Sequence, residues 1–172
     1  MTFPVLTVLG LLRLVVALVL AVTPLGEKAA KALGLAGSLL TLVLGAVVVI
    51  ATATGDVLAE KVAWIRPIGA WWALGPTDGL SATMVALTVI LTPIVLGAAW
   101  LEGDRIGGVA EGAEPVQRWS AKAFFALVLT VEGLALIAFL ATDVFLFFLA
   151  FEAILIPMYF LIGGFGGAKR RR

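Results

Sequence analysis

The sequence predicts an all-α integral membrane protein with about five transmembrane helices, and three observations lead to this fold class. Hydrophobic residues make up 62% of the 172 residues and charged residues only 13%, a balance that soluble domains do not show. The mean hydropathy is +1.16. The apolar runs are unbroken rather than alternating, which favours helices over a membrane β-barrel. We therefore treat residues 1–172 as a single membrane domain.

Each expected span is an apolar run of about 20 residues, the length that a helix needs to cross the hydrocarbon core. The first run begins without charge and no small-residue cleavage site follows it, so we expect a retained helix rather than a signal peptide. Gly34, Gly37 and Gly45 in the second run predict close contact between helices. The expected helices are residues 3–22, 33–52, 80–100, 121–141 and 144–163.

Two long connections separate these runs. Residues 54–79 combine charges with Trp64, Trp71 and Trp72, which is typical of a loop at the membrane interface. A lid over neighbouring loops is the alternative interpretation. Residues 101–120 are polar and rich in glycine, and they predict a cytoplasmic loop.

The distribution of Lys and Arg predicts the orientation. With five spans, the short connection 27–31, the segment 101–122 and the C-terminus share one side of the membrane. That side carries nine basic residues, whereas the other side carries only Lys61 and Arg66. The positive-inside rule then places the N-terminus outside and the C-terminus in the cytoplasm of a multi-pass protein of the cell inner (plasma) membrane. The nine are Lys28, Lys31, Arg105, Arg118, Lys122, Lys169, Arg170, Arg171 and Arg172.

Composition also narrows the chemistry. Cysteine and histidine are absent, which removes disulfides, thiolate metal sites and histidine-ligated haem. We therefore expect neither a cofactor nor a metal site. The net charge of +1 gives no reason to expect a nucleic-acid partner. No dinucleotide fingerprint follows a strand, which excludes a soluble dehydrogenase.

Two carboxylates, Glu132 and Glu152, lie inside the apolar run 121–163. As one helix this run would be roughly twice the hydrocarbon thickness, so it must fold back once. The natural break is Thr142–Asp143, where Asp143 can cap the second helix. Each glutamate is then about 15 Å from the turn, near the middle of the membrane. A charge there costs at least ~2.5–3.5 kcal/mol, which is why such residues are usually functional. We expect the two acids to form a proton relay.

Pro157, Asp143 and Pro93 are candidates for a structural or hinge role, and Arg13 is a further charge inside an expected span. Arg13 lies near the middle of the first run, too far from either end to reach a headgroup easily, which favours pairing with a carboxylate of a neighbouring helix over snorkelling. Pro157 follows Glu152 by five residues, frees the carbonyl of Ala153 and predicts a bend. Simple packing of this proline is the alternative. Pro93 predicts a kink in the third run.

The segment Asp143–Gly164, DVFLFFLAFEAILIPMYFLIGG, resembles the signature of subunit M of the proton-pumping NADH-quinone oxidoreductase (respiratory complex I), the counterpart of mitochondrial chain 4. Residues 131–133 and 139–141 are similar to the fourth helix of this family. Residues 77–80, 87–88 and 91–93 are similar to its third helix. The resemblance covers residues 76–167, and the first two expected helices agree in placement only.

This resemblance implies an antiporter-like subunit of the membrane arm. Such a subunit contacts other membrane subunits and the lipid bilayer, holds no redox cofactor, and contributes to proton translocation coupled to NADH oxidation and quinone reduction. Glu152 would pair with a lysine on a later helix, and Glu132 would be a neighbouring acid. The family has more helices and commonly has proline near the position of Arg13. No lysine lies near the middle of any expected span, so we expect an N-terminal fragment that is not catalytic alone.

Other interpretations stay open at this point. The chain could belong to a related cation/proton antiporter of the Mrp type or to a hydrogenase-linked pump. It could be a non-catalytic membrane scaffold, in which the carboxylates only form hydrogen bonds between helices. It could also be a small transporter that completes its path by oligomerising.

Overall fold

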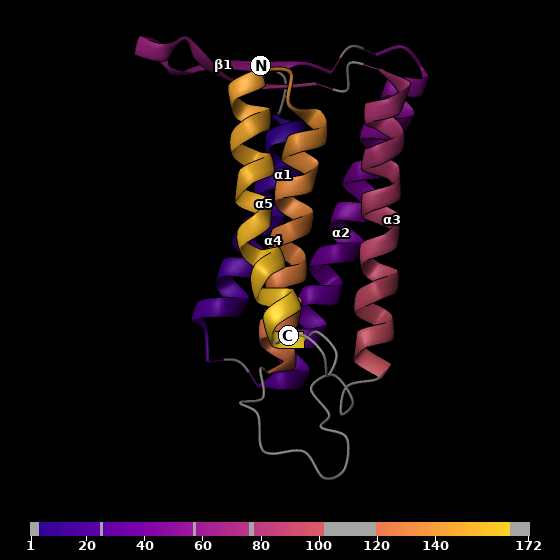
Figure 1. Ribbon diagram of the computed structural model, residues 1–172. Coiled ribbons are helices and arrows are strands. Elements are labelled where there is room, and N and C mark those ends of the chain that lie inside the picture. The colour runs from indigo at the N-terminus through magenta and orange to yellow at the C-terminus, as the bar shows by residue number, and fades with distance from the viewer. Residues whose placement is uncertain (1–3, 25, 57, 76–77, 102–119, 166–172) are drawn as a thin grey trace.

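The computed structural model describes residues 4–24, 26–56, 58–75, 78–101 and 120–165. Five helices run along a common direction as one bundle (Figure 1). All five are long and apolar enough to cross a membrane, which confirms the predicted fold class. The expected loop 101–120 lies almost entirely outside the described residues, as does the basic C-terminal end. The helices are α1 Val5–Val22, α2 Glu27–Ala53, α3 Gly79–Leu101, α4 Ala121–Leu140 and α5 Val144–Phe165.

Helix α4 is the centre of the bundle because it packs against each of the other four helices. Helix α5, by contrast, packs mainly on α4 and on one strand of the hairpin described below. Most of the large apolar side chains of α5 are therefore exposed, among them Phe148, Phe151 and Ile156. The core of the bundle is formed mainly by α1, α2, α3 and α4, and α5 contributes Leu146 and Ala150 to it.

Helix α2 begins earlier than the apolar run that predicted it. The short connection expected at 27–31 forms the first turn of the helix, because the chain turns within Thr23–Gly26 and the helix starts at Glu27. Helical hydrogen bonding continues beyond the hydrocarbon-length segment, and an acidic residue in the first turn is favourable at the positive end of the helix dipole. An apolar window detects the membrane-spanning part of such a helix but not its polar end.

A β-hairpin occupies the connection between α2 and α3, for which the sequence predicted an interfacial loop without naming its strands. Strand β1, Glu60–Ile65, pairs antiparallel with β2, Ala70–Leu74, across the 3-10 turn Arg66–Ile68. Gly69 closes the turn with a positive φ of 69°, which glycine adopts without strain. The hairpin lies across one end of the bundle (Figure 1).

The hairpin is joined to the turn between α4 and α5. The amide of Gly75 donates to the carbonyl of Leu140 at 2.8 Å, and the amide of Thr142 donates to the carbonyl of Ala73 at 2.9 Å. The far side of β2 is thus paired with this turn, which satisfies backbone groups at an otherwise open strand edge. The hairpin therefore holds the end of the α4–α5 pair in place.

Glu60 of β1 caps the N-terminus of α1 from a distance of more than fifty residues in sequence. Its carboxylate accepts from the amides of Leu6 at 2.7 Å and Thr7 at 2.9 Å, and from the Thr7 hydroxyl at 2.6 Å. The indole of Trp72 also donates to the Thr7 hydroxyl, at 2.9 Å. The carboxylate satisfies free N–H groups at the positive end of the helix dipole.

The tryptophans of the hairpin differ in burial. Trp72 is half-buried and joins the hairpin to α1, whereas Trp64 and Trp71 are exposed by 44% and 39%. The interfacial position and the lid both stay predictions.

Replacing Glu60 with alanine is expected to lower the free energy of unfolding by about 1–2 kcal/mol, because two backbone donors of α1 lose their acceptor. Thermal unfolding of the full chain in detergent micelles measures the change. Asp56→Ala is the matched control, since Asp56 is exposed and makes no side-chain hydrogen bond within the described residues. Equal losses in the two variants would show that the cap contributes nothing specific.

The glycines of α2 allow the close packing that the sequence predicted. A Cβ atom on Gly34 would lie 2.7 Å from the ring of Phe125, and one on Gly45 would lie 2.8 Å from Val89. A Cβ atom on Gly37 would lie 3.2 Å from Val16. These contacts confirm that α2 uses its small residues against α4, α3 and α1.

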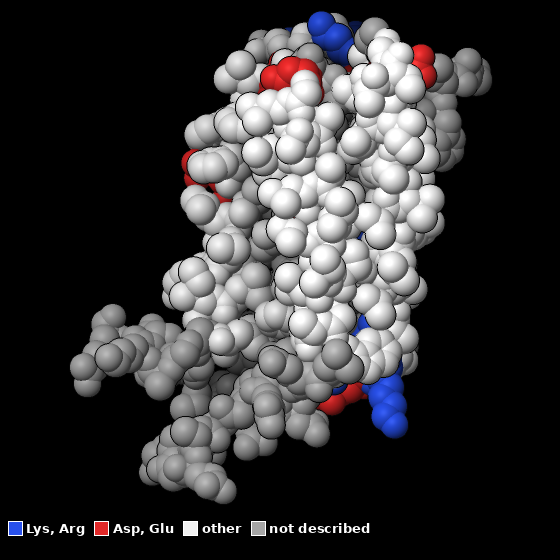
Figure 2. Space-filling view, turned by 90° about the vertical axis from the view of Figure 1, so that its right-hand side faces the viewer, with Lys and Arg blue, Asp and Glu red and all other residues white. Residues whose placement is uncertain are grey.

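Charged side chains gather at the two ends of the bundle. Figure 2 shows a face that is almost entirely uncharged between these ends. Ten of the thirteen charged residues in the described part of the chain lie at or beyond the helix ends. At the hairpin end these are Asp56, Glu60, Lys61, Arg66, Asp78 and Asp143, and at the other end they are Glu27, Lys28, Lys31 and Lys122.

Candidate functional site: charges within the helices

Three charged residues of the described chain lie well inside helices: Arg13 in α1, Glu132 in α4 and Glu152 in α5. Each is near the middle of its helix. Their surroundings differ sharply. Arg13 and Glu132 are buried, whereas Glu152 is exposed.

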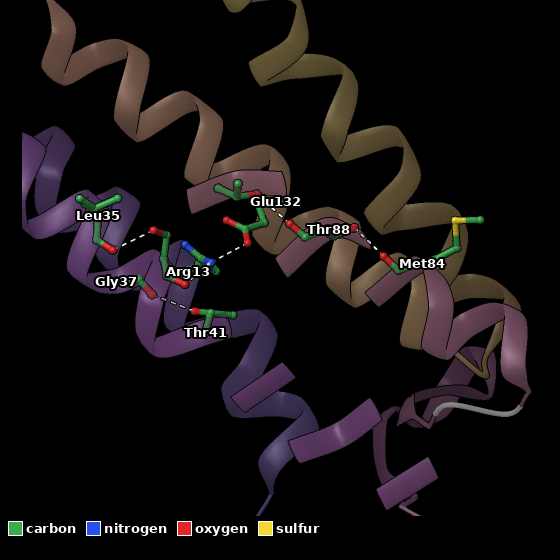
Figure 3. Close-up of polar contacts among 9 residues, drawn as sticks. Arg13, Leu35, Gly37, Thr41, Met84, Thr88 and Glu132 are labelled. Carbon is green, nitrogen blue, oxygen red and sulfur yellow. Dashed lines mark hydrogen bonds and ion pairs between the residues drawn. The ribbon is translucent and has the colours of Figure 1, made fainter. Parts of the chain in front are cut away.

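Arg13 and Glu132 form an ion pair in the interior of the bundle (Figure 3). The Nη2 atom of Arg13 lies 2.5 Å from Oε1 of Glu132, and the two side chains are 0% and 2% exposed. The same nitrogen is 3.4 Å from the carbonyl oxygen of Ser38 in α2. The pair thus joins α1 to α4, with a longer contact to α2. The partner that the sequence left open for Arg13 is Glu132.

Two glycines bring α1 and α4 close enough for this pair. A Cβ atom on Gly133 would lie 2.9 Å from the Cβ of Arg13 and 3.1 Å from the carbonyl oxygen of Gly10. A Cβ atom on Gly10 would lie 2.5 Å from the side chain of Ile137. Small residues at a crossing point let membrane helices approach closely. The helix crossing therefore coincides with the ion pair.

Hydroxyl groups from α2 and α3 lie near the pair, and each of them donates a hydrogen bond to a backbone carbonyl of its own helix. Thr92 donates to the carbonyl of Thr88 at 3.0 Å, and Thr88 donates to that of Met84 at 2.8 Å. In α2, Ser38 donates to the carbonyl of Leu35 and Thr41 to that of Gly37. Figure 3 shows these contacts along both helices. Spacings of three and four residues within apolar runs are the sequence signal that would have placed them on one face.

Three polar atoms of the pair have no hydrogen-bond partner among the described residues. They are Nε and Nη1 of Arg13 and Oε2 of Glu132. The hydroxyls of Ser38, Thr41 and Thr88 donate to backbone carbonyls of their own helices. The Thr92 hydroxyl acts on the Glu132 carboxylate as a hydrogen-bond donor as well. Arg13 is the one charged donor to Glu132 within the described part of the chain.

Glu152 lies on the exposed face of α5, away from the Arg13–Glu132 pair. Within the described residues it makes no hydrogen bond or ion pair, and nothing connects it to Glu132. Within the described residues, the structure therefore does not bring the two glutamates together. The reason is helical phase: α4 turns Glu132 toward α1, whereas α5 turns Glu152 away from the bundle.

The other candidate residues have identifiable local roles. Asp143 caps α5, because its Oδ1 accepts from the amides of Phe145 at 3.0 Å and Leu146 at 3.1 Å. Pro157 is buried inside α5 and Pro93 lies inside α3. Each proline removes one backbone donor from its helix. Within the described residues, no group of three or more metal-ligating side chains occurs.

The fold and these residues define a multi-pass helical membrane protein with ionisable groups inside its spans. Comparison with known proteins identifies the family. The chain is 38% identical to NADH-quinone oxidoreductase subunit M from two strains of Mycobacterium tuberculosis, with 98% of the chain aligned. It is 36% identical over 118 residues, 69% of its length, to NAD(P)H-quinone oxidoreductase chain 4 of Synechococcus sp. strain WH7803. No protein-family model matches.

The chain belongs to the subunit M (chain 4) family of NADH-quinone oxidoreductases, as its fifth-helix motif predicted. It spans 34% of the length of the M. tuberculosis proteins, and its match covers 18% of the Synechococcus protein.

Proposed function

We propose that this chain contributes to proton translocation as part of a membrane-arm subunit of an NADH-quinone oxidoreductase, in which translocation is coupled to NADH oxidation and quinone reduction. Family membership supports this proposal. The observation that carries it is the position of Glu152, a carboxyl group near the middle of a membrane-length helix, on a face that no described residue covers.

An ionised carboxylate cannot face hydrocarbon without a large cost in free energy. Glu152 must therefore be neutral, or it must face a cation outside the described five helices. A carboxyl group that alternates between these two states takes up and releases a proton at the centre of the membrane. In this proposal the cation belongs to the remainder of the subunit, because the relatives are about three times as long as this chain.

The remaining features of the proposal concern location and partners. The subunit lies in the plasma membrane with the hairpin outside and the other end of the bundle in the cytoplasm. The described charges support this orientation, since four acidic and two basic residues lie at the hairpin end, whereas three lysines and one acidic residue lie at the other. This is the distribution that the positive-inside rule describes. Other membrane subunits of the complex and the bilayer are the partners, and the chain holds no cofactor of its own.

Replacing Glu152 with glutamine in the complete oxidoreductase that carries this chain tests the proposal. We expect proton pumping and the coupled quinone reduction to fall by about tenfold or more, because a group that transfers protons is removed. Proton uptake into sealed vesicles and NADH-dependent quinone reduction are the measurements. Glu152→Asp is the matched control, since it keeps the carboxyl group and should keep a measurable part of the activity.

The amount of assembled complex must be the same in all variants. Unchanged pumping in the glutamine variant at normal assembly would exclude Glu152 as a proton carrier. It would favour the view that the carboxyl groups of this chain have only a structural function.

A further inference from the structure

Glu132 is buried beside Arg13, whereas Glu152 is exposed. This difference points to different functions for the two acids. We propose that Arg13 is a positioning residue that keeps Glu132 permanently ionised, so that Glu132 is a fixed charge and Glu152 alone among the described intramembrane carboxyl groups exchanges protons. The statement about Glu152 rests on the proposed function. The statement that Arg13 fixes the charge of Glu132 stands independently of it.

The charges that face Glu132 can be counted from the elements packed on α4. Helix α1 supplies Arg13, and α3 contains no charged residue. The charged residues of α2, namely Glu27, Lys28 and Lys31, lie in its first turns, far from the middle of the bundle. Helix α5 carries Glu152, which is exposed on its outer side. Within the described chain, Arg13 is therefore the one charged group that determines the state of Glu132.

Protonation of Glu132 would be unfavourable while Arg13 is present. An arginine side chain does not lose its proton in proteins, so a neutral Glu132 would leave a guanidinium ion buried without a counter-charge. Breaking a buried pair in this way is far more costly than losing an exposed one. The near-complete burial of both side chains separates the pair from bulk solvent, which would otherwise reduce this cost.

The geometry also fixes where the guanidinium group lies. The close crossing at Gly133 and Gly10 holds the backbone of α1 against α4 at the level of Arg13. The Ser38 carbonyl contacts the same nitrogen that contacts Glu132. Arg13 is thus held between α2 and α4 and is directed to one oxygen of the carboxylate.

The test measures the protonation state of Glu132 in the full chain reconstituted in lipid bilayers. Infrared spectroscopy detects the absorption band of a protonated carboxyl group. The wild-type chain should show no protonated carboxyl signal that depends on Glu132. Arg13→Met should create one such signal, because a lone buried carboxylate is costly and takes up a proton. The double variant R13M/E132Q, which carries no charge at this site, should lack the signal and serves as the reference.

Stability as a function of pH gives a second, independent measurement. In the R13M variant the folded chain binds a proton that the unfolded chain releases at neutral pH. Its stability should therefore fall as the pH rises from mildly acidic to mildly alkaline. The R13M/E132Q reference should not show this slope. A pair with only a packing function would change the stability of R13M equally at every pH.

Two results would overturn the proposal. One is a protonated Glu132 signal in the wild-type chain, measured against the R13M/E132Q reference, and this comparison remains available even if the single variant R13M does not fold. The other is a folded R13M chain with neither the new signal nor the pH slope. Neither measurement involves pumping, so failure here is distinguishable from failure of the Glu152→Gln experiment.

Discussion

Replacing Glu132 with methionine is expected to lower the free energy of unfolding by about 3–5 kcal/mol, because it leaves Arg13 buried without a counter-charge. The loss should exceed that caused by Arg13→Met. The asymmetry arises because an unpaired glutamate can become neutral by binding a proton, whereas an unpaired arginine cannot lose one. Denaturant or thermal unfolding of the full chain in micelles compares the two variants.

The double variant R13M/E132M is the control for this asymmetry. It replaces both charges by apolar side chains of similar length, so much of the stability lost in Glu132→Met should return. A double-mutant cycle then gives the coupling between the two sites. Equal losses in the two single variants, or a double variant whose losses simply add, would show that charge compensation does not hold α1 against α4.

The sequence predicted the membrane architecture well because hydrocarbon imposes simple rules. A helix satisfies its own backbone, so length and continuous hydrophobicity are enough to find α1, α3, α4 and α5. The break at Thr142–Asp143 followed from the same reasoning about length, and the structure places the turn between α4 and α5 there. The polar first turn of α2 was missed because it lies beyond the apolar run.

The hairpin and the partner of Arg13 depend on contacts between segments that are distant in sequence. Glu60 and Thr7 are separated by 53 residues and Arg13 and Glu132 by 119, so no local pattern links them. For the hairpin, two short aromatic segments flanking Pro67 and Gly69 were the available signal. For the charged residues, the sequence placed each one near the middle of its helix, but it did not show which face each helix turns inward, since these helices are apolar nearly all round.

Gly133 connects the packing of the bundle to its buried charge pair, and Gly133→Leu is expected to lower the free energy of unfolding by about 3 kcal/mol or more. Even the first carbon of the new side chain would lie 3.1 Å from the backbone oxygen of Gly10 and 2.9 Å from the Cβ of Arg13. A backbone atom cannot move aside as a flexible side chain can. Helix α1 must therefore shift away from α4.

That shift should also separate Arg13 from Glu132, so the variant is expected to combine lost packing with a weakened ion pair. The matched control is Gly97→Leu in α3, where a Cβ atom meets no described atom within 4 Å. There the loss of a flexible glycine should be neutral or slightly stabilising. Unfolding measurements on both variants decide the matter. If Gly97→Leu were as damaging as Gly133→Leu, the effect would come from adding leucine to any helix, and the crossing of α1 and α4 would not be the point where the buried charge pair is held.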